Sequence, residues 1–180
     1  MQRGLHQLVE AEFLYQRGLP PQATYTFKHA LIQDAAYQSL LRSTRQQYHQ
    51  RIAQVLAVQF PEVVETQPEL LAHHYTEAGL AEQAIPYWQQ AGERAVQHSA
   101  NVEAIGHLTK GITLLKQLEE TTERLQQELA CQTALGTALM VTKGYAAPEV
   151  EQTYSRAQEI CQKGGDAPQL FSALWGVWYF

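Results

Sequence analysis

The chain has few of the features that mark a metalloprotein, a secreted protein or a membrane protein. Its 180 residues include only two cysteines, Cys131 and Cys161, with no C-x2-C pair. This spacing indicates neither a zinc site nor a disulfide framework, so we expect two reduced, partly buried thiols. No run of about 18 apolar residues is present, and the N-terminus lacks the apolar stretch of a signal peptide. These absences predict a cytoplasmic chain without membrane contact.

Sequence motifs of catalysis and metal binding are also missing. Gly106 and Gly111 have the glycine spacing of a phosphate-binding loop, but Ile112 stands where a lysine is needed, and the segment is predicted to be helical. His73 and His74 are adjacent, so on a helix they point about 100° apart and cannot both face one metal ion. No G-x-S-x-G or H-E-x-x-H motif occurs, and we expect the scattered carboxylates to lie on solvated faces. We therefore predict no catalytic residue, no cofactor and no bound metal.

The charge balance argues against nucleic acid as the main partner. The formal net charge is −5, which disfavours binding to a polyanion. Residues 28–51 nevertheless hold four basic residues against Asp34, namely Lys28, Arg42, Arg45 and Arg51. This local excess has three interpretations: a DNA-binding face, a contact with another domain, or an ordinary solvated surface.

What the sequence does contain is a repeat signature at residues 68–91. Its apolar, small and aromatic residues fall on one face of each of two helices joined at a glycine turn. The spacing resembles that of a tetratricopeptide repeat (TPR) hairpin, with an ordinary amphipathic hairpin as the alternative; the signature residues are Leu71, Ala72, Tyr75, Gly79, Ala84, Trp88 and Ala91.

Two further partial copies favour a TPR-like array over a chance hairpin. Leu135 and Gly136 repeat the first-helix pattern, and Tyr154 with Ala157 completes a second hairpin after a turn at Gly144. A third copy opens near the C-terminus with Trp175, Gly176 and Tyr179.

The N-terminal segment has a different pattern. Residues 5–16 have apolar residues at helical spacing, and the following Gly and Pro residues end the predicted helix. Residues 24–28 alternate polar and aromatic side chains, as a short strand does. Its partner is expected either near the turn at residues 18–22 or upstream of this chain.

Further helices are predicted from residue 29 onward. Ser43 and Gln46 have the spacing of a capping box, and the helix after them carries an apolar stripe of Tyr48, Ile52, Val55, Leu56 and Phe60. Ser99 or Asn101 is expected to cap a helix that runs to residue 118, with a stripe of Ile105, Leu108, Ile112 and Leu115. A helix follows over residues 122–141, and Pro148 is expected near the start of the next.

A broader resemblance covers nearly the whole chain. Residues 25–37, followed by Arg45, His49, Ile52 and Ala53, resemble the segment found after the nucleotide-binding core in large signal-transduction ATPases, many of them fused to class III adenylyl or guanylyl cyclase domains. The resemblance implies a winged-helix-like module that leads into TPR-like helices. The ATPase core and the cyclase domain have no counterpart in these residues, so neither activity is assigned to them.

Together these patterns predict an all-α chain of antiparallel helical hairpins, a TPR-like α-solenoid with one short β element near residues 24–28. We expect a winged-helix-like segment at residues 1–62 and TPR-like repeats at residues 63–180. The predicted function is a non-catalytic interaction and relay segment of a larger signalling ATPase, binding a protein, a peptide or other domains of the parent chain. The alternatives are a DNA-binding regulator fragment and an enzyme subunit completed by a partner.

The last ten residues carry a separate expectation. They crowd apolar side chains into what resembles a first repeat helix without its partner: Phe171, Leu174, Trp175, Val177, Trp178, Tyr179 and Phe180. Because a repeat helix buries its aromatic face on its partner, we expect a truncated array that self-associates through this helix.

Overall fold

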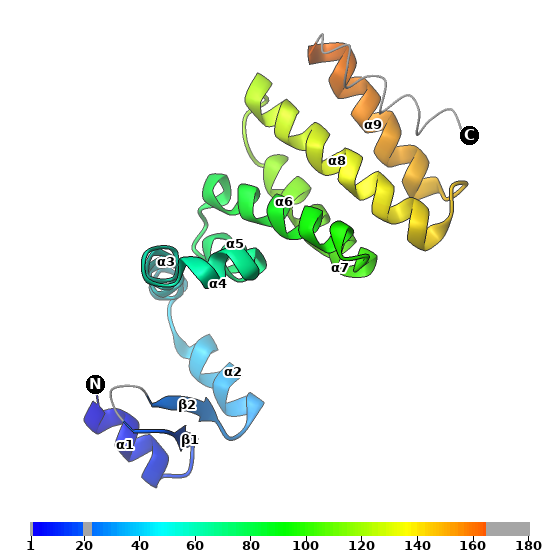
Figure 1. Ribbon diagram of the computed structural model, residues 1–180. Coiled ribbons are helices and arrows are strands. Elements are labelled where there is room, and N and C mark those ends of the chain that lie inside the picture. The colour runs from blue at the N-terminus through cyan, green and yellow to red at the C-terminus, as the bar shows by residue number, and fades with distance from the viewer. Residues whose placement is uncertain (1, 20–22, 165–180) are drawn as a thin grey trace. The chain divides into compact units, whose positions relative to one another are not determined.

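The computed structural model describes residues 2–19 and 23–164, which are mostly helical (Figure 1). The prediction of a helical chain with one small β element is confirmed. The chain divides into two compact units, residues 1–46 and 47–180, and this division falls within helix α3. The assignment of residues 1–62 and 63–180 to two functional domains stays a prediction.

The first unit combines two helices with a two-stranded sheet. Its elements are α1 (Gln2–Glu10), β1 (Leu14–Arg17), β2 (Thr24–Phe27) and α2 (Ala30–Ser39). The strands are antiparallel, with Leu14 opposite Phe27 and Arg17 opposite Thr24. The predicted strand is therefore confirmed, and its partner is the segment just before the Gly18 turn.

The predicted helix over residues 5–16 is wrong in its second half. The helix ends at Glu10, and Glu12 adopts a φ of 61° in the left-handed region. Phe13 donates its N–H to the Leu8 carbonyl at 2.9 Å, and Glu12 donates to Val9 at 3.0 Å. This pair of bonds is a Schellman motif, which closes the helix without a glycine. The chain is then free to enter β1.

The second unit is built from consecutive helices. From α5 onward each helix packs against the next, and the short connections make neighbours antiparallel. The bounds are α3 (Arg42–Gln59, divided between the units), α4 (Pro61–Thr66), α5 (Pro68–Glu77), α6 (Ala81–Gln97), α7 (Asn101–Leu115), α8 (Thr122–Lys143) and α9 (Pro148–Gly164).

The helix starts agree with the sequence in part. Pro148 is the first residue of α9, where its missing N–H is tolerated, as predicted. The predicted cap of α7 is wrong: its N-cap is Ala100, while Ser99, with a φ of 59°, belongs to the end of α6. The predicted capping box is also wrong, because Ser43 already lies inside α3.

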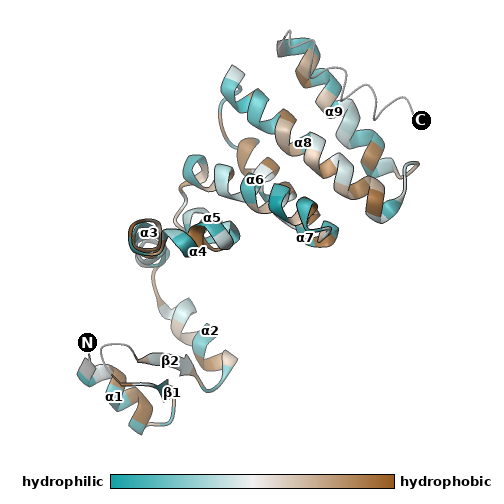
Figure 2. Cartoon of the chain, viewed as in Figure 1, coloured by the Kyte–Doolittle hydropathy of each residue, from teal (hydrophilic) through white to brown (hydrophobic). Residues whose placement is uncertain are grey.

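The core of the second unit lies between α5 and α9. Apolar residues from these five helices form one buried cluster, and a smaller cluster follows between α8 and α9. Figure 2 shows hydrophobic and hydrophilic residues alternating along α8 and α9, as expected of helices with one buried face. Within the described ranges, no helix is long and apolar enough to cross a bilayer.

The predicted apolar stripe of α3 is not its buried face. Tyr48, Ile52 and Val55 are exposed, and Phe60, after the end of the helix, is exposed as well. The buried residues are His49 and Ala53, each one position further along the helix. A shift of one residue turns the buried face of the helix by about 100°. The polar His49 and the small Ala53 are therefore buried, and the large apolar side chains next to them are exposed.

Candidate functional site

The repeat signature of residues 68–91 occupies the α5–α6 hairpin. Five of its seven residues are buried: Leu71, Ala72, Ala84, Trp88 and Ala91. Tyr75 is half-buried and stacks on Tyr87, with ring centroids 5.9 Å apart. Gly79 has a φ of 77°, a conformation that glycine adopts without strain, and ends α5 in a Schellman motif.

Trp88 joins this hairpin to the next helix. Its indole N–H donates to the Thr76 hydroxyl at 2.9 Å, and its ring stacks on His107 of α7 with centroids 5.4 Å apart. The Lys110 ammonium lies 4.5 Å from the ring centroid. The polar N–H of Trp88 therefore has a hydrogen-bond acceptor and its apolar ring is packed on both neighbouring side chains, as a buried tryptophan requires.

The second predicted hairpin corresponds to α8 and α9. Leu135 and Gly136 lie on α8, Tyr154 and Ala157 lie on α9, and all four are buried. A Cβ added to Gly136 would lie 2.6 Å from Tyr154 ring atoms, so the ring occupies the space that the glycine leaves. The third predicted copy lies outside the described residues, with Trp175, Gly176 and Tyr179, and so does the helix predicted for the last ten residues.

A similar interlock between α6 and α7 was not predicted. A Cβ on Gly92 would clash with the Leu108 side chain. Of the two glycines of α7, Gly111 faces Trp88 at 3.4 Å by the same measure, while Gly106 has nothing within 4 Å. Gly111 therefore lies at a close approach of α7 to α6, whereas Gly106 does not. The apolar stripe of α7 is confirmed, since Leu108, Ile112 and Leu115 are buried.

Three histidines meet where α3 faces α5. The Nδ1 atoms of His49 and His74 lie 2.9 Å apart, and the His73 ring lies 5.7 Å from His49 and 5.4 Å from His74 between centroids. Burial is the main cause that lowers the pKa of both His49 and His74. The adjacency of His73 and His74 was visible in the sequence, but no periodicity links either residue to His49.

Metal binding is not supported by this cluster. In the part of the chain that the structure describes, no group of three or more His, Cys, Asp or Glu side chains is arranged to hold a metal ion. Both cysteines are buried thiols, as expected. Burial raises the pKa of Cys131 to about 12, so its thiol stays protonated and unreactive at neutral pH.

One carboxylate contradicts the prediction of solvated acidic side chains. Glu128 is fully buried and accepts two bonds from Arg156, at 2.7 and 3.1 Å. Arg124 lies 3.1 Å from the same carboxylate and donates its Nε–H to the Leu115 carbonyl at 2.8 Å. This network ties the end of α7 to α8 and α9. Charged residues carry no periodic signal, so the sequence pattern missed it.

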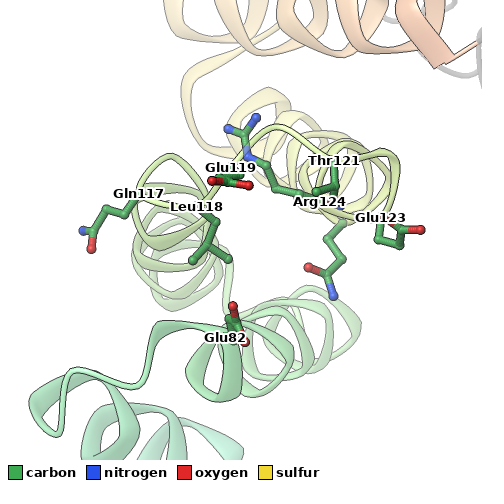
Figure 3. Close-up of a pocket in the computed structure, with 8 residues that line it drawn as sticks. Glu82, Gln117, Leu118, Glu119, Thr121, Glu123 and Arg124 are labelled. Atoms are coloured by element: carbon green, nitrogen blue, oxygen red, sulfur yellow. Dashed lines mark hydrogen bonds between the residues drawn. The ribbon is translucent and has the colours of Figure 1, made fainter.

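A cleft opens beside this network, around the α7–α8 connection (Figure 3). Its volume is about 520 Å³, and its lining is mostly polar: Glu82, Gln117, Leu118, Glu119, Thr121, Glu123, Arg124 and Gln127. The Arg124 guanidinium is already bound to Glu120 and Glu128. The lining includes neither a Ser or Cys nucleophile nor a histidine base, so the residues here do not form a catalytic triad.

Two side chains of the basic stretch at residues 28–51, Lys28 and Arg45, make contacts within the first unit. Lys28 lies 3.8 Å from Glu12 and 5.0 Å from the Tyr15 ring centroid. Arg45 lies over the Tyr37 ring at 5.1 Å. The three interpretations of this basic stretch stay predictions.

Sequence comparison finds that the chain is similar to one segment of a much larger protein. No protein-family model matches the chain, and no solved structure matches it. It is similar to "Uncharacterized protein R02095" of Rhizobium meliloti (strain 1021), with 31% identity over 173 residues. The match covers 95% of this chain but only 17% of the relative's length.

Proposed function

We propose that this chain is a non-catalytic protein-interaction and relay segment of a larger signalling ATPase, with adenylyl or guanylyl cyclase as a candidate output domain. A winged-helix-like segment at residues 1–62 leads into TPR-like hairpins at residues 63–180. A protein, a peptide or another domain of the same protein is the proposed partner.

The observation that carries the proposal is the repeated interlock between consecutive helices. Gly92 of α6 receives Leu108 of α7, and Gly136 of α8 receives Tyr154 of α9. Small residues opposite large ones at each helix crossing are typical of arrays in which one hairpin stacks on the next. The buried signature of α5 and α6 supports the same interpretation.

The comparison with the larger relative supports a role as one segment among several. Because 173 aligned residues cover 17% of that protein, most of its length is available for catalytic domains.

The Rhizobium meliloti relative provides the test. The purified whole protein is expected to hydrolyse ATP, whereas this 180-residue chain alone should show no turnover above a blank. A version of the relative without the matched segment should hydrolyse ATP at a changed rate. If the whole relative has no ATPase activity, the signalling-ATPase assignment is wrong; turnover by the isolated chain would refute the non-catalytic role.

A further inference from the structure

The contact between α3 and α5 depends on a pair of histidines. Among the described elements, α3 has no extensive packing partner, and its buried residues are His49 and Ala53. The His49 side chain meets His74 of α5 through the two Nδ1 atoms, 2.9 Å apart. Weakening this hydrogen bond therefore weakens one attachment of α3 to α5.

Protonation is the change to which this hydrogen bond is most sensitive. A hydrogen bond between two Nδ1 atoms needs one N–H donor and one bare nitrogen acceptor. If both rings are protonated, each Nδ1 carries a hydrogen and neither can accept, so the hydrogen bond is lost. The two positively charged rings then repel each other. The pair can take up one additional proton and keep the Nδ1–Nδ1 hydrogen bond, but a second additional proton breaks it.

The surrounding charges act on the pair in both directions. Glu77 of α5 favours the protonated form of both rings, whereas His73 of α5 disfavours it. Burial of the rings is the largest effect and lowers the pKa of each below the ordinary value of 6.5. The neutral pair is therefore the stable form near pH 7, because the buried contact disfavours protonation of either ring.

We propose that His49 and His74 form a proton-sensitive latch that holds residues 47–59 of α3 against α5 at neutral pH and releases them on acidification. The sign follows from linkage. The released state binds protons with an ordinary pKa, so it binds more protons than the latched state below about pH 6.5. The latch is fully closed above that pH and loosens as the pH falls. The proposal is independent of the ATPase assignment.

Hydrogen exchange at pH 7.5 and pH 5.5 tests the latch in the whole chain, after correction for the intrinsic pH dependence of exchange. Protection of α3 amides in residues 50–59 should fall by up to about tenfold for each titrating ring at pH 5.5, which is one unit below the ordinary pKa of 6.5. Protection within α8 and α9 should stay constant over the same range. His49→Gln and, separately, His74→Gln remove one of the two titrating rings, so the fall in α3 protection at pH 5.5 should be clearly smaller in each variant than in the wild type.

His98→Gln is the matched control, because His98 is exposed at the end of α6 and its variant should behave as the wild type does. The latch is refuted if wild-type α3 protection is unchanged at pH 5.5, or if the loss persists undiminished in both latch variants. Equal loss of protection in α8 and α9 would indicate global unfolding and would also overturn the proposal. If one variant fails to fold at pH 7.5 by circular dichroism, the other variant and the wild-type profile still decide.

Discussion

The ring of Tyr154 on α9 fills the space that a side chain at Gly136 on α8 would occupy. A Cβ at position 136 would lie 2.6 Å from Cε2 and Cζ of the ring, well inside van der Waals contact. Both residues are buried, and Tyr154 belongs to the main core cluster. The two helices can therefore approach at this crossing only while residue 136 lacks a side chain.

Gly136→Ala is expected to destabilise the chain. The added methyl group must displace the Tyr154 ring or separate α8 from α9, and overpacking of this kind costs about 1–3 kcal/mol. Gly106→Ala is the matched control, because Gly106 lies exposed in α7 with nothing within 4 Å of its missing Cβ. The control should be stabilised by up to about 1 kcal/mol through helix propensity. Urea unfolding of both variants measures the difference; similar stabilities would contradict the interlock.

Trp88→Ala is expected to lower the free energy of unfolding by about 3–5 kcal/mol, through lost burial and the cavity that remains. Trp88 is 3% exposed and contacts residues of α5 and α7, so the loss should reach all three helices. Tyr48→Ala provides the comparison, since that ring is 53% exposed and should matter little. An unchanged thermal unfolding curve for Trp88→Ala would mean that Trp88 is not a core residue.

The helical fold was predictable where apolar residues recur with helical period. In α7 and in the α5–α6 hairpin the same residues supply the pattern and the core, so Leu108 and Trp88 could be placed in advance. The prediction failed where another interaction determined the buried face. In α3 the hydrogen bond of His49 competes with the apolar stripe, and at Glu12 backbone hydrogen bonds end α1 without a glycine.

The polar interior was not predictable from local pattern. Glu128 and Arg156 stand 28 positions apart, on different helices, and each alone has the spacing of an ordinary surface residue. Only the packing of α8 on α9 brings them together and buries the carboxylate. The same holds for His49 and His74, which are separated by 25 positions. Long-range polar pairs need the tertiary structure before they can be recognised.

Glu128→Gln is expected to cost roughly 3 kcal/mol of stability, because it removes the fully buried counter-charge that the buried Arg124 and the half-buried Arg156 share. Glutamine matches glutamate in size, so the variant tests charge and not cavity formation. Glu159→Gln removes the exposed partner of Arg156 and should cost less than about 1 kcal/mol. Equal effects of the two substitutions, measured by chemical unfolding at pH 7, would show that the buried pair contributes no more than the surface pair.

The same carboxylate should make the chain sensitive to acid in a defined range. Burial by itself would raise the pKa of Glu128, but the hydrogen bonds and charges of Arg156 and Arg124 outweigh it and hold the pKa below the ordinary value of 4.5. Between the two pKa values the unfolded chain binds more protons than the folded chain, so this contribution is complete above about pH 4.5 and is lost as the pH falls through the folded pKa.

We therefore expect the free energy of unfolding of the wild type to decrease more steeply than that of Glu128→Gln between about pH 5 and pH 3. Comparing the two proteins cancels the contributions of the carboxylates and histidines that they share. Urea unfolding at half-unit pH steps measures both curves. Because the substituted glutamine cannot titrate, the gap between the curves should narrow as the pH falls; a constant gap down to about pH 3 would show that the Glu128 pKa is the same in the folded and unfolded chains.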